Sequence, residues 1–287
     1  MSAQAVAGWR LLREFAVMKT GKTIISALFL ALAVLPLASY AQQSPGAGHL
    51  HAVDLASQGK FPEAKKIFQD ILAGDPAHER SLHCLNILED LEKQKIKKET
   101  AVHLFKGLSY FYQDRFTDAL GEANLALGVD PGYKRCYNAR GGAYFGLGQN
   151  EEALADFNRA LKIDPEYAGA FYNRGCVYIR TEEYARAIHD FDRALKITPK
   201  FASAFYNRGI AHFHQGQFLW ALADFNRALE INPRLTEAHM NRAVALEELG
   251  KEKEAREAYK KFLQDASPAL TREIDYARKR LEVLWKK

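Results

Sequence analysis

The sequence predicts an all-α solenoid of about six stacked helix-turn-helix repeats, with an inserted helix after the first repeat and a capping helix at the C-terminal end. The first observation is a unit of 34 residues that occurs three times in succession and closes on Pro165, Pro199 and Pro233. A fixed period of this size is typical of repeat arrays. The second observation is that apolar residues recur at three- and four-residue steps within each unit, which indicates amphipathic helices.

Each unit is interpreted as two antiparallel helices. In the unit that begins at Lys134, the helical pattern covers residues 137–147 and 151–161, separated by the turn residues Gly148-Gln149-Asn150. The Asp164-Pro165 pair ends the second helix, because the residue before a proline is disfavoured in the helical region. Helices this short cannot bury their apolar sides alone, so the units must stack on one another.

The residues at fixed positions of each unit resemble the tetratricopeptide repeat family. That family places a large residue, a small residue four positions later, an aromatic, an alanine, a second aromatic, another alanine and a proline. Two successive units carry this series: Tyr137, Gly141, Tyr144, Ala153, Phe157, Ala160 and Pro165, then Phe171, Gly175, Tyr178, Ala187, Phe191, Ala194 and Pro199. Small residues allow the paired helices to approach closely, and the aromatics fill the space between pairs. The resemblance covers about residues 45–287 and implies a right-handed α-solenoid.

The repeats are expected within a solenoid of residues 49–287, at about 45–78, 100–133, 134–167, 168–201, 202–235 and 236–268. The interval from Pro76 to Pro131 exceeds the period, and the surplus predicts an inserted or extended helix at 79–97. In the second repeat, Ala123 replaces the usual aromatic. Residues 269–286 are amphipathic and suit the capping helix that repeat arrays need to cover their last apolar face.

Residues 1–41 are predicted to be a secretory signal peptide. Lys19 and Lys22 precede an apolar run at 24–39, and the small residues around Ala41 suit signal peptidase. We therefore expect a periplasmic or secreted protein of a bacterial cell envelope.

Two alternatives at this end of the chain stay open. The apolar run is interrupted by Pro36 and is shorter than the roughly 20 residues of a spanning helix, but an uncleaved segment would anchor the protein in the inner membrane, facing the periplasm. Met18 would make a more typical start, which would leave residues 1–17 as an over-long gene model. Residues 42–48 are expected to be a short linker.

Composition and motifs argue against catalysis and against nucleic acid. The formal net charge is +5, and part of it lies within the first 41 residues, so no nucleic-acid footprint is indicated. The sequence carries no phosphate-binding loop, nucleophile elbow, paired-acid motif or convergent metal-ligand spacing, and we expect no enzyme activity, cofactor or metal. The three cysteines, Cys84, Cys136 and Cys176, are expected to be free and partly buried.

The candidate binding surface is the concave groove that the first helix of each repeat lines in the family. The residue two before the small glycine points into that groove, and here it is Asn173, Asn207 or Asn241. This series resembles the asparagine ladder of the tetratricopeptide superhelix attached to O-linked N-acetylglucosamine transferase. Carboxamides both donate and accept, so a row of them can bind the backbone of an extended peptide. The alternative is that these asparagines face solvent or brace the next helix. The remaining groove candidates are Tyr172, Tyr206, Met240, Phe145, Phe213, Arg180 and His214.

Two further features have alternative interpretations. Arginines that follow the asparagine positions and aspartates in the second helices recur with the same period, which favours ion pairs from repeat to repeat over a ligand site. Leu219 and Trp220 place an apolar pair on an outer helix, which indicates either a convex contact with a partner or packing against a neighbouring side chain.

These features favour a non-enzymatic scaffold that binds an extended peptide of a protein partner in its groove. The alternative is a regulatory or targeting subunit of an envelope enzyme, which would contact that enzyme through Leu219 and Trp220. A glycan-binding groove is a further possibility, because aromatic-lined grooves also stack on sugars. The oligomeric state does not follow from the sequence.

Overall fold

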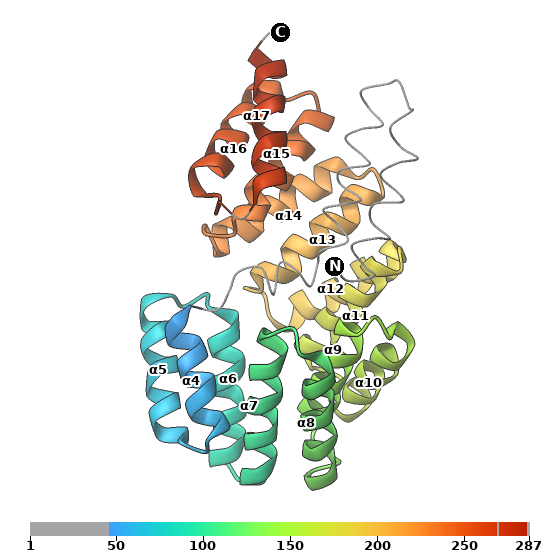
Figure 1. Ribbon diagram of the computed structural model, residues 1–287. Helices are drawn as coiled ribbons and strands as arrows, with labels where there is room; N and C mark the ends of the chain where they lie inside the picture. Colours follow the sequence, from blue (N-terminus) through green and yellow to red (C-terminus); the bar gives the residue numbers. More distant parts are fainter. Residues whose placement is uncertain (1–45, 269, 286–287) are drawn as a thin grey trace.

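The computed structural model describes residues 46–268 and 270–285, and the predicted signal peptide lies outside them. Fourteen α-helices and no strands occur in these residues. Their bounds are α4 (Ala47–Ser57), α5 (Phe61–Gly74), α6 (Glu79–Glu92), α7 (Lys98–Tyr112), α8 (Phe116–Val129), α9 (Lys134–Gly146), α10 (Asn150–Ile163), α11 (Ala168–Arg180), α12 (Tyr184–Ile197), α13 (Ala202–His214), α14 (Phe218–Ile231), α15 (Thr236–Glu248), α16 (Glu252–Asp265) and α17 (Thr271–Trp285). The all-α solenoid predicted from the sequence is therefore confirmed (Figure 1).

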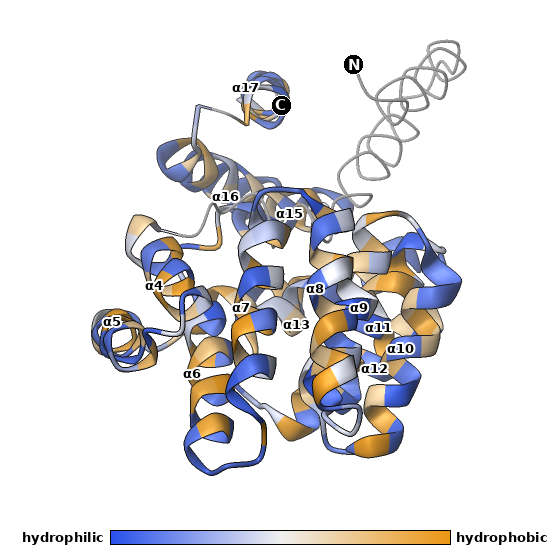
Figure 2. Cartoon of the chain, turned by 60° about the horizontal axis from the view of Figure 1, so that its bottom comes forward, coloured by the Kyte–Doolittle hydropathy of each residue, from blue (hydrophilic) through white to orange (hydrophobic). Residues whose placement is uncertain are grey.

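The helices stack as antiparallel pairs from α7 to α16. From α9 onward, each first helix packs on the second helix of its own repeat and on the second helix of the preceding repeat. Apolar and polar residues alternate around the helices, as Figure 2 shows. Across the residues that the structure describes, no helix combines the length and the apolar character needed to span a membrane.

Contacts between glycines and phenylalanines set the spacing within the pairs. A Cβ atom added to Gly175 would lie 2.8 Å from the ring of Phe191, and one added to Gly209 would lie 2.7 Å from the ring of Phe225. Both rings are fully buried. The small residue at this position therefore makes room for the aromatic of the second helix, as the repeat pattern predicts.

The turns inside the repeats require a left-handed backbone at one position. Gly148 and Gly216 have φ of 80° and 73° there, whereas the equivalent residues of two other repeats are Asp114 (φ 56°) and Glu182 (φ 61°). Glycine adopts this region without steric cost, whereas other residues are strained in it.

The last helix, α17, packs against α16 and covers the end of the array. Ala277 and Leu284 are its buried residues. Arg280 donates to the Glu247 carboxylate of α15, with a shortest distance of 2.5 Å between Nη2 and Oε1. The predicted capping helix thus forms, and a partly buried ion pair links it to the preceding repeat.

The inserted helix α6 changes the architecture at the N-terminal end. It ends at Glu92, five residues before the end of the predicted segment 79–97. Because α6 follows α5, the first repeat does not stack in the regular way: α4 packs on both α5 and α7, and α6 packs on α5. The other side of α6 faces the first helices of the next repeats.

Candidate binding cavity between α6 and the first helices

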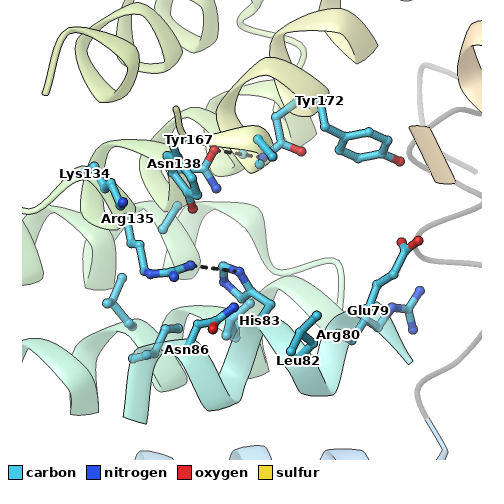
Figure 3. Close-up of a pocket in the computed structure, with 18 of the residues that line it drawn as sticks. Glu79, Arg80, Leu82, His83, Asn86, Lys134, Arg135, Asn138, Tyr167 and Tyr172 are labelled. Atoms are coloured by element: carbon cyan, nitrogen blue, oxygen red, sulfur yellow. Dashed lines mark hydrogen bonds between the residues drawn. The ribbon is translucent and has the colours of Figure 1, made fainter. Parts of the chain in front are cut away.

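A cavity of about 420 Å³ lies between α6 and the row of first helices α7, α9 and α11. This volume is within the range of about 300–1,000 Å³ that is typical of ligand pockets. In Figure 3, Leu82, His83 and Asn86 extend from α6 into the space, and Arg135 and Asn138 face them from α9. The cavity therefore has two walls, one from the inserted helix and one from the solenoid.

Small residues in two repeats create the space. Ala123 stands where the next three repeats place the buried rings of Phe157, Phe191 and Phe225, and it lines the cavity. Gly142 also lines it, and an added Cβ would have only one neighbour within 4 Å, a ring carbon of Phe111 at 3.9 Å. The replacement of the usual aromatic by Ala123, which is visible in the sequence, thus leaves one side of the cavity unfilled.

Polar contacts at both ends hold α6 in place. At its start, the Glu79 carboxylate accepts hydrogen bonds from the backbone N–H and the hydroxyl of Ser203, at 3.1 and 2.6 Å. Ser203 lies in the first turn of α13, whose own N-cap residue, Phe201, makes no side-chain capping bond. Glu79 therefore caps a helix 124 residues further along the chain. Burial raises the pKa of the Glu79 carboxyl, and the hydrogen bonds from Ser203 act in the opposite direction.

His49 of α4 links the other side of α6 to α7. Its Nδ1 lies 3.0 Å from the hydroxyl of Ser81, and its Nε2 lies 3.2 Å from the hydroxyl of Tyr112. The ring is almost fully buried, and burial, together with His78 and Arg80, lowers the pKa of His49 to about 3. The neutral imidazole donates with one ring nitrogen and accepts with the other, and each hydroxyl can take either role, so both contacts can be hydrogen bonds.

Arg135 is the cationic group at the centre of the cavity. Its Nε lies 3.4 Å from the Asp90 carboxylate, and its Nη1 lies 3.4 Å from Nδ1 of His83. Burial and the Arg135 charge lower the pKa of His83 to about 3, so the imidazole is neutral at physiological pH and accepts from the guanidinium. Asp90 is shared, because the hydroxyl of Tyr133 also donates to it at 2.8 Å. The Arg135 guanidinium also lies 5.5 Å from the ring centroid of Tyr167.

The predicted asparagine series lies inside the array. Asn207 and Asn241 are buried, and each donates at 2.9 Å to a tyrosine hydroxyl of the preceding first helix: Asn207 to Tyr172, and Asn241 to Tyr206. Asn173 makes the equivalent bond to Asn138 at 2.9 Å. The sequence analysis treated the asparagine series and the tyrosines Tyr172 and Tyr206 as separate groove candidates. In the structure, Asn207 and Asn241 are hydrogen-bonded to these tyrosines.

Only part of the predicted groove set lies at the cavity. Asn173, Tyr172 and Phe145 line it, whereas the others do not: Asn207, Asn241, Tyr206, Met240, Phe213, Arg180 and His214. Met240 and Phe213 are buried in the main hydrophobic cluster. The cavity therefore draws on the N-terminal members of the predicted set.

Arg180 and His214 occupy equivalent positions at the ends of α11 and α13, and both contact the preceding repeat. Arg180 donates to the carbonyl of Phe145 at 2.7 Å and to Asn150, and its guanidinium lies 3.3 Å from the centroid of the Phe145 ring. His214 stacks on Tyr184, with 4.7 Å between ring centroids, and burial lowers the pKa of His214 to about 4. Both side chains join successive repeats.

The periodic arginines and aspartates form ion pairs, but the pairing within a repeat was not predicted. Arg174 binds the Asp190 carboxylate of its own repeat with two bonds, at 2.6 and 2.7 Å. Its remaining terminal nitrogen donates at 2.5 Å to Asn158 of the preceding repeat. The bidentate carboxylate partner lies in the same repeat, because the paired helices bring together residues 16 apart. The expected ion pair from repeat to repeat occurs at Arg208, which also donates to Asp192 of the preceding repeat at 2.5 Å.

The cysteines are more buried than expected. Cys84, Cys136 and Cys176 are free and have no exposed surface. Burial raises the pKa of the Cys136 and Cys176 thiols to about 12, which disfavours the reactive thiolate. Within the described residues, no group of three or more His, Cys, Asp or Glu side chains is placed to hold a metal ion.

Leu219 and Trp220 are exposed on α14, each with 67% of its surface accessible. The Trp220 ring lies 6.2 Å from the ring of His212, but most of the indole stays open to solvent. The apolar pair that the sequence places on an outer helix is therefore largely uncovered.

The sequence interpretation missed the residues that face the cavity from α6 and from the start of α9. These are His83, Asn86, Lys134, Arg135 and Asn138. Asn138 occupies the repeat position of Tyr172 and Tyr206, so the 34-residue period could have indicated it. Nothing in the period could have indicated His83 or Asn86, because α6 belongs to no repeat.

Comparison with protein families matches three overlapping stretches of the chain. A family described as "TPR repeat" matches residues 141–181, and two described as "Tetratricopeptide repeat" match residues 174–240 and 216–270. Residues 141–270 are thus similar to tetratricopeptide repeats. No curated protein sequence matches the chain.

Solved structures with the same fold cover more of the chain. A structure from Pseudomonas aeruginosa, solved in a study of pilF, has a TM-score of 0.58 at 18% identity, over 65% of this chain and 89% of its own. A thermophilic TPR protein from Thermus thermophilus has a TM-score of 0.54 at 20% identity, over 63% and 98%. MamA, from residue 41 to its end, from Desulfovibrio magneticus, has a TM-score of 0.52 at 18% identity, over 59% and 96%. At these identities, the likeness concerns the fold.

Proposed function

We propose that this protein is a non-enzymatic scaffold that binds an extended peptide segment of a protein partner in the cavity between α6 and helices α7, α9 and α11. The observation that carries the proposal is the cavity itself, which is about 420 Å³ and is lined by polar and apolar groups. The carboxamides of Asn86, Asn138 and Asn173 line it together with apolar side chains, and such a surface suits a peptide backbone and its side chains. The tetratricopeptide repeats and the solenoid fold support a protein-interaction role.

The proposed location is outside the cytoplasm. The basic residues Lys19 and Lys22, the apolar run at 24–39 and the small residues near Ala41 support export by a signal peptide. The partner would then be a periplasmic or secreted protein, or the exposed part of a membrane protein.

A cavity-filling variant tests the proposal. Gly142→Leu introduces a side chain that the equivalent position of the second repeat already carries as Leu108, so we expect the helix pair to tolerate it. The full chain with a C-terminal affinity tag would capture partners from an envelope extract, with mass spectrometry as the readout. A partner that binds the wild type and is lost from Gly142→Leu supports the cavity, provided that circular dichroism and the melting temperature are unchanged.

The exposed pair on α14 favours a second candidate function. A regulatory or targeting subunit could contact its enzyme through Leu219 and Trp220, since 67% of each side chain is open to solvent. The double variant Leu219→Ala, Trp220→Ala is the matched control. A partner lost from this variant and retained by Gly142→Leu would contradict the cavity proposal and support the convex contact.

A further inference from the structure

From the partners of Arg135 in the cavity we infer the chemistry of the segment that it binds: an acidic side chain in the middle of the extended peptide, with its carboxylate on Arg135. This inference rests on the proposed function. Of the cationic side chains that line the cavity, Lys134 is paired with Asp164, whereas Arg135 lies 3.4 Å from its carboxylate partner, Asp90. A cation whose carboxylate partner is this distant is complementary to an acidic ligand.

Arg135 differs from the periodic arginines Arg174 and Arg208 in its partners. Arg174 and Arg208 each hold one carboxylate with two bonds, at distances between 2.6 and 2.9 Å. The two hydrogen bonds of Arg135 are both 3.4 Å long, and one of them goes to a neutral imidazole. N–H···O bonds in proteins are typically about 2.7–3.2 Å long. Arg135 thus lacks the bidentate carboxylate that its fork-shaped guanidinium favours.

Asp90 does not provide that carboxylate. Its Oδ2 accepts from Tyr133 at 2.8 Å as well as from Arg135, and its Oδ1 accepts from Lys95 at 3.2 Å. One carboxylate is therefore shared by two cations and a phenol. Only 11% of the Arg135 side chain is exposed, so a ligand carboxylate would meet it in a poorly solvated site, where charge-assisted bonds are strong.

The extent of the cavity favours a side-chain carboxylate over a C-terminal one. The lining continues on both sides of Arg135: toward His103 and Leu104 of α7 in one direction, and toward Tyr172 and Phe201 in the other. A peptide chain can therefore pass Arg135 and continue. Apolar residues line these flanks, so we expect apolar side chains on either side of the acidic one.

Labelled nonapeptide pools provide the test. Three pools have both termini blocked and randomised flanks, and their central residue is fixed as Glu, Gln or Lys. A fourth pool has a free C-terminal carboxylate and no acidic residue. Binding to the full chain is measured by fluorescence anisotropy. We expect the Glu pool to bind at least about tenfold more tightly than the Gln pool, because a buried bidentate pair adds charge-assisted bonds. We also expect this ratio to fall at high salt.

Variants test whether Arg135 causes the preference for the Glu pool. Arg135→Gln should remove the difference between the Glu and Gln pools, Arg135→Lys should retain part of it, and Arg159→Gln, which removes an exposed arginine outside the cavity, should leave it intact. If Arg135→Gln does not fold, the ratio of the Glu-pool affinity to the Gln-pool affinity in the wild type, and its dependence on salt, still test the preference for an acidic residue. Equal binding of the Glu and Gln pools, or binding of the free C-terminal pool alone, would overturn the inference and leave the peptide cavity standing. Binding of none of the pools would overturn both.

Discussion

The regular repeats and the N-terminal region achieve order in different ways. In residues 134–235 a glycine under a phenylalanine and an arginine on an aspartate return with every repeat, and the last two of these three repeats add an asparagine that donates to the preceding repeat. In residues 46–112 the polar contacts occur once each and join distant segments, as Glu79 and Ser203 do. Periodic short-range contacts thus build the solenoid, and unique long-range contacts shape its cavity.

The largest effect is expected from emptying a position in the regular core. Phe191→Ala removes a fully buried ring and leaves a space beside Gly175, so we expect a loss of about 4 kcal/mol in the free energy of unfolding. Urea unfolding monitored by circular dichroism measures it. The control Leu219→Ala shortens an exposed side chain and should change stability by less than about 0.5 kcal/mol. A loss for Phe191→Ala as small as that of the control would contradict the packing role of the glycine-phenylalanine contact.

The next effect tests the periodic ion pairs. Asp190→Ala leaves the Arg174 guanidinium without its carboxylate in a site where only 18% of the side chain is exposed, and we expect a loss of about 3 kcal/mol. The matched control is Glu183→Ala, which removes the carboxylate of an exposed pair with Arg186 and should cost much less, because solvent screens the pair. The same denaturation experiment compares the two variants. Equal losses would mean that burial does not strengthen the periodic pairs.

The third prediction concerns acid and the N-terminal region. The pKa of His49 is about 3 in the folded protein, against 6.5 for an unperturbed histidine. Below pH 6.5, the unfolded chain binds a proton at His49 that the folded protein does not, so the stability from this residue is lost as the pH falls, by about 1.4 kcal/mol per unit until about pH 3.

Replacing His49 should therefore flatten the response to acid. We expect the urea midpoint of His49→Gln to fall less between pH 7 and pH 5 than that of the wild type, while the exposed control His51→Gln should follow the wild type. An unchanged slope in His49→Gln would contradict the role of the buried neutral imidazole.

The smallest loss of stability is expected at the contact between Glu79 and Ser203, where α6 caps α13. There the change in local hydrogen exchange is more informative than the change in overall stability. Glu79→Ala removes both bonds to Ser203, and we expect a loss of about 1 kcal/mol together with faster amide hydrogen exchange in the first turns of α6 and α13. Glu89→Ala removes an exposed carboxylate from the same helix and should leave α13 unaffected. If exchange in α13 is unchanged in Glu79→Ala, this contact does not couple the two helices.

The fold was predictable wherever its causes are local. The 34-residue period, the glycine-phenylalanine spacing and the prolines after the second helices depend on neighbouring residues, so the sequence alone indicated the helix pairs. The periodic arginines and aspartates were recognised as ion pairs for the same reason, although the sequence did not show that the bidentate pairs lie within one repeat.

The cavity depended on contacts that no local pattern contains. The sequence by itself determined that residues 79–97 hold a helix, because periodic leucines specify an amphipathic segment. Only the tertiary structure decided that α6 faces α7, α9 and α11 across the cavity, since that placement rests on single contacts such as His83 with Arg135 and Glu79 with Ser203. A repeated contact leaves a period in the sequence, whereas a contact made once, between residues 52 or 124 positions apart, leaves none.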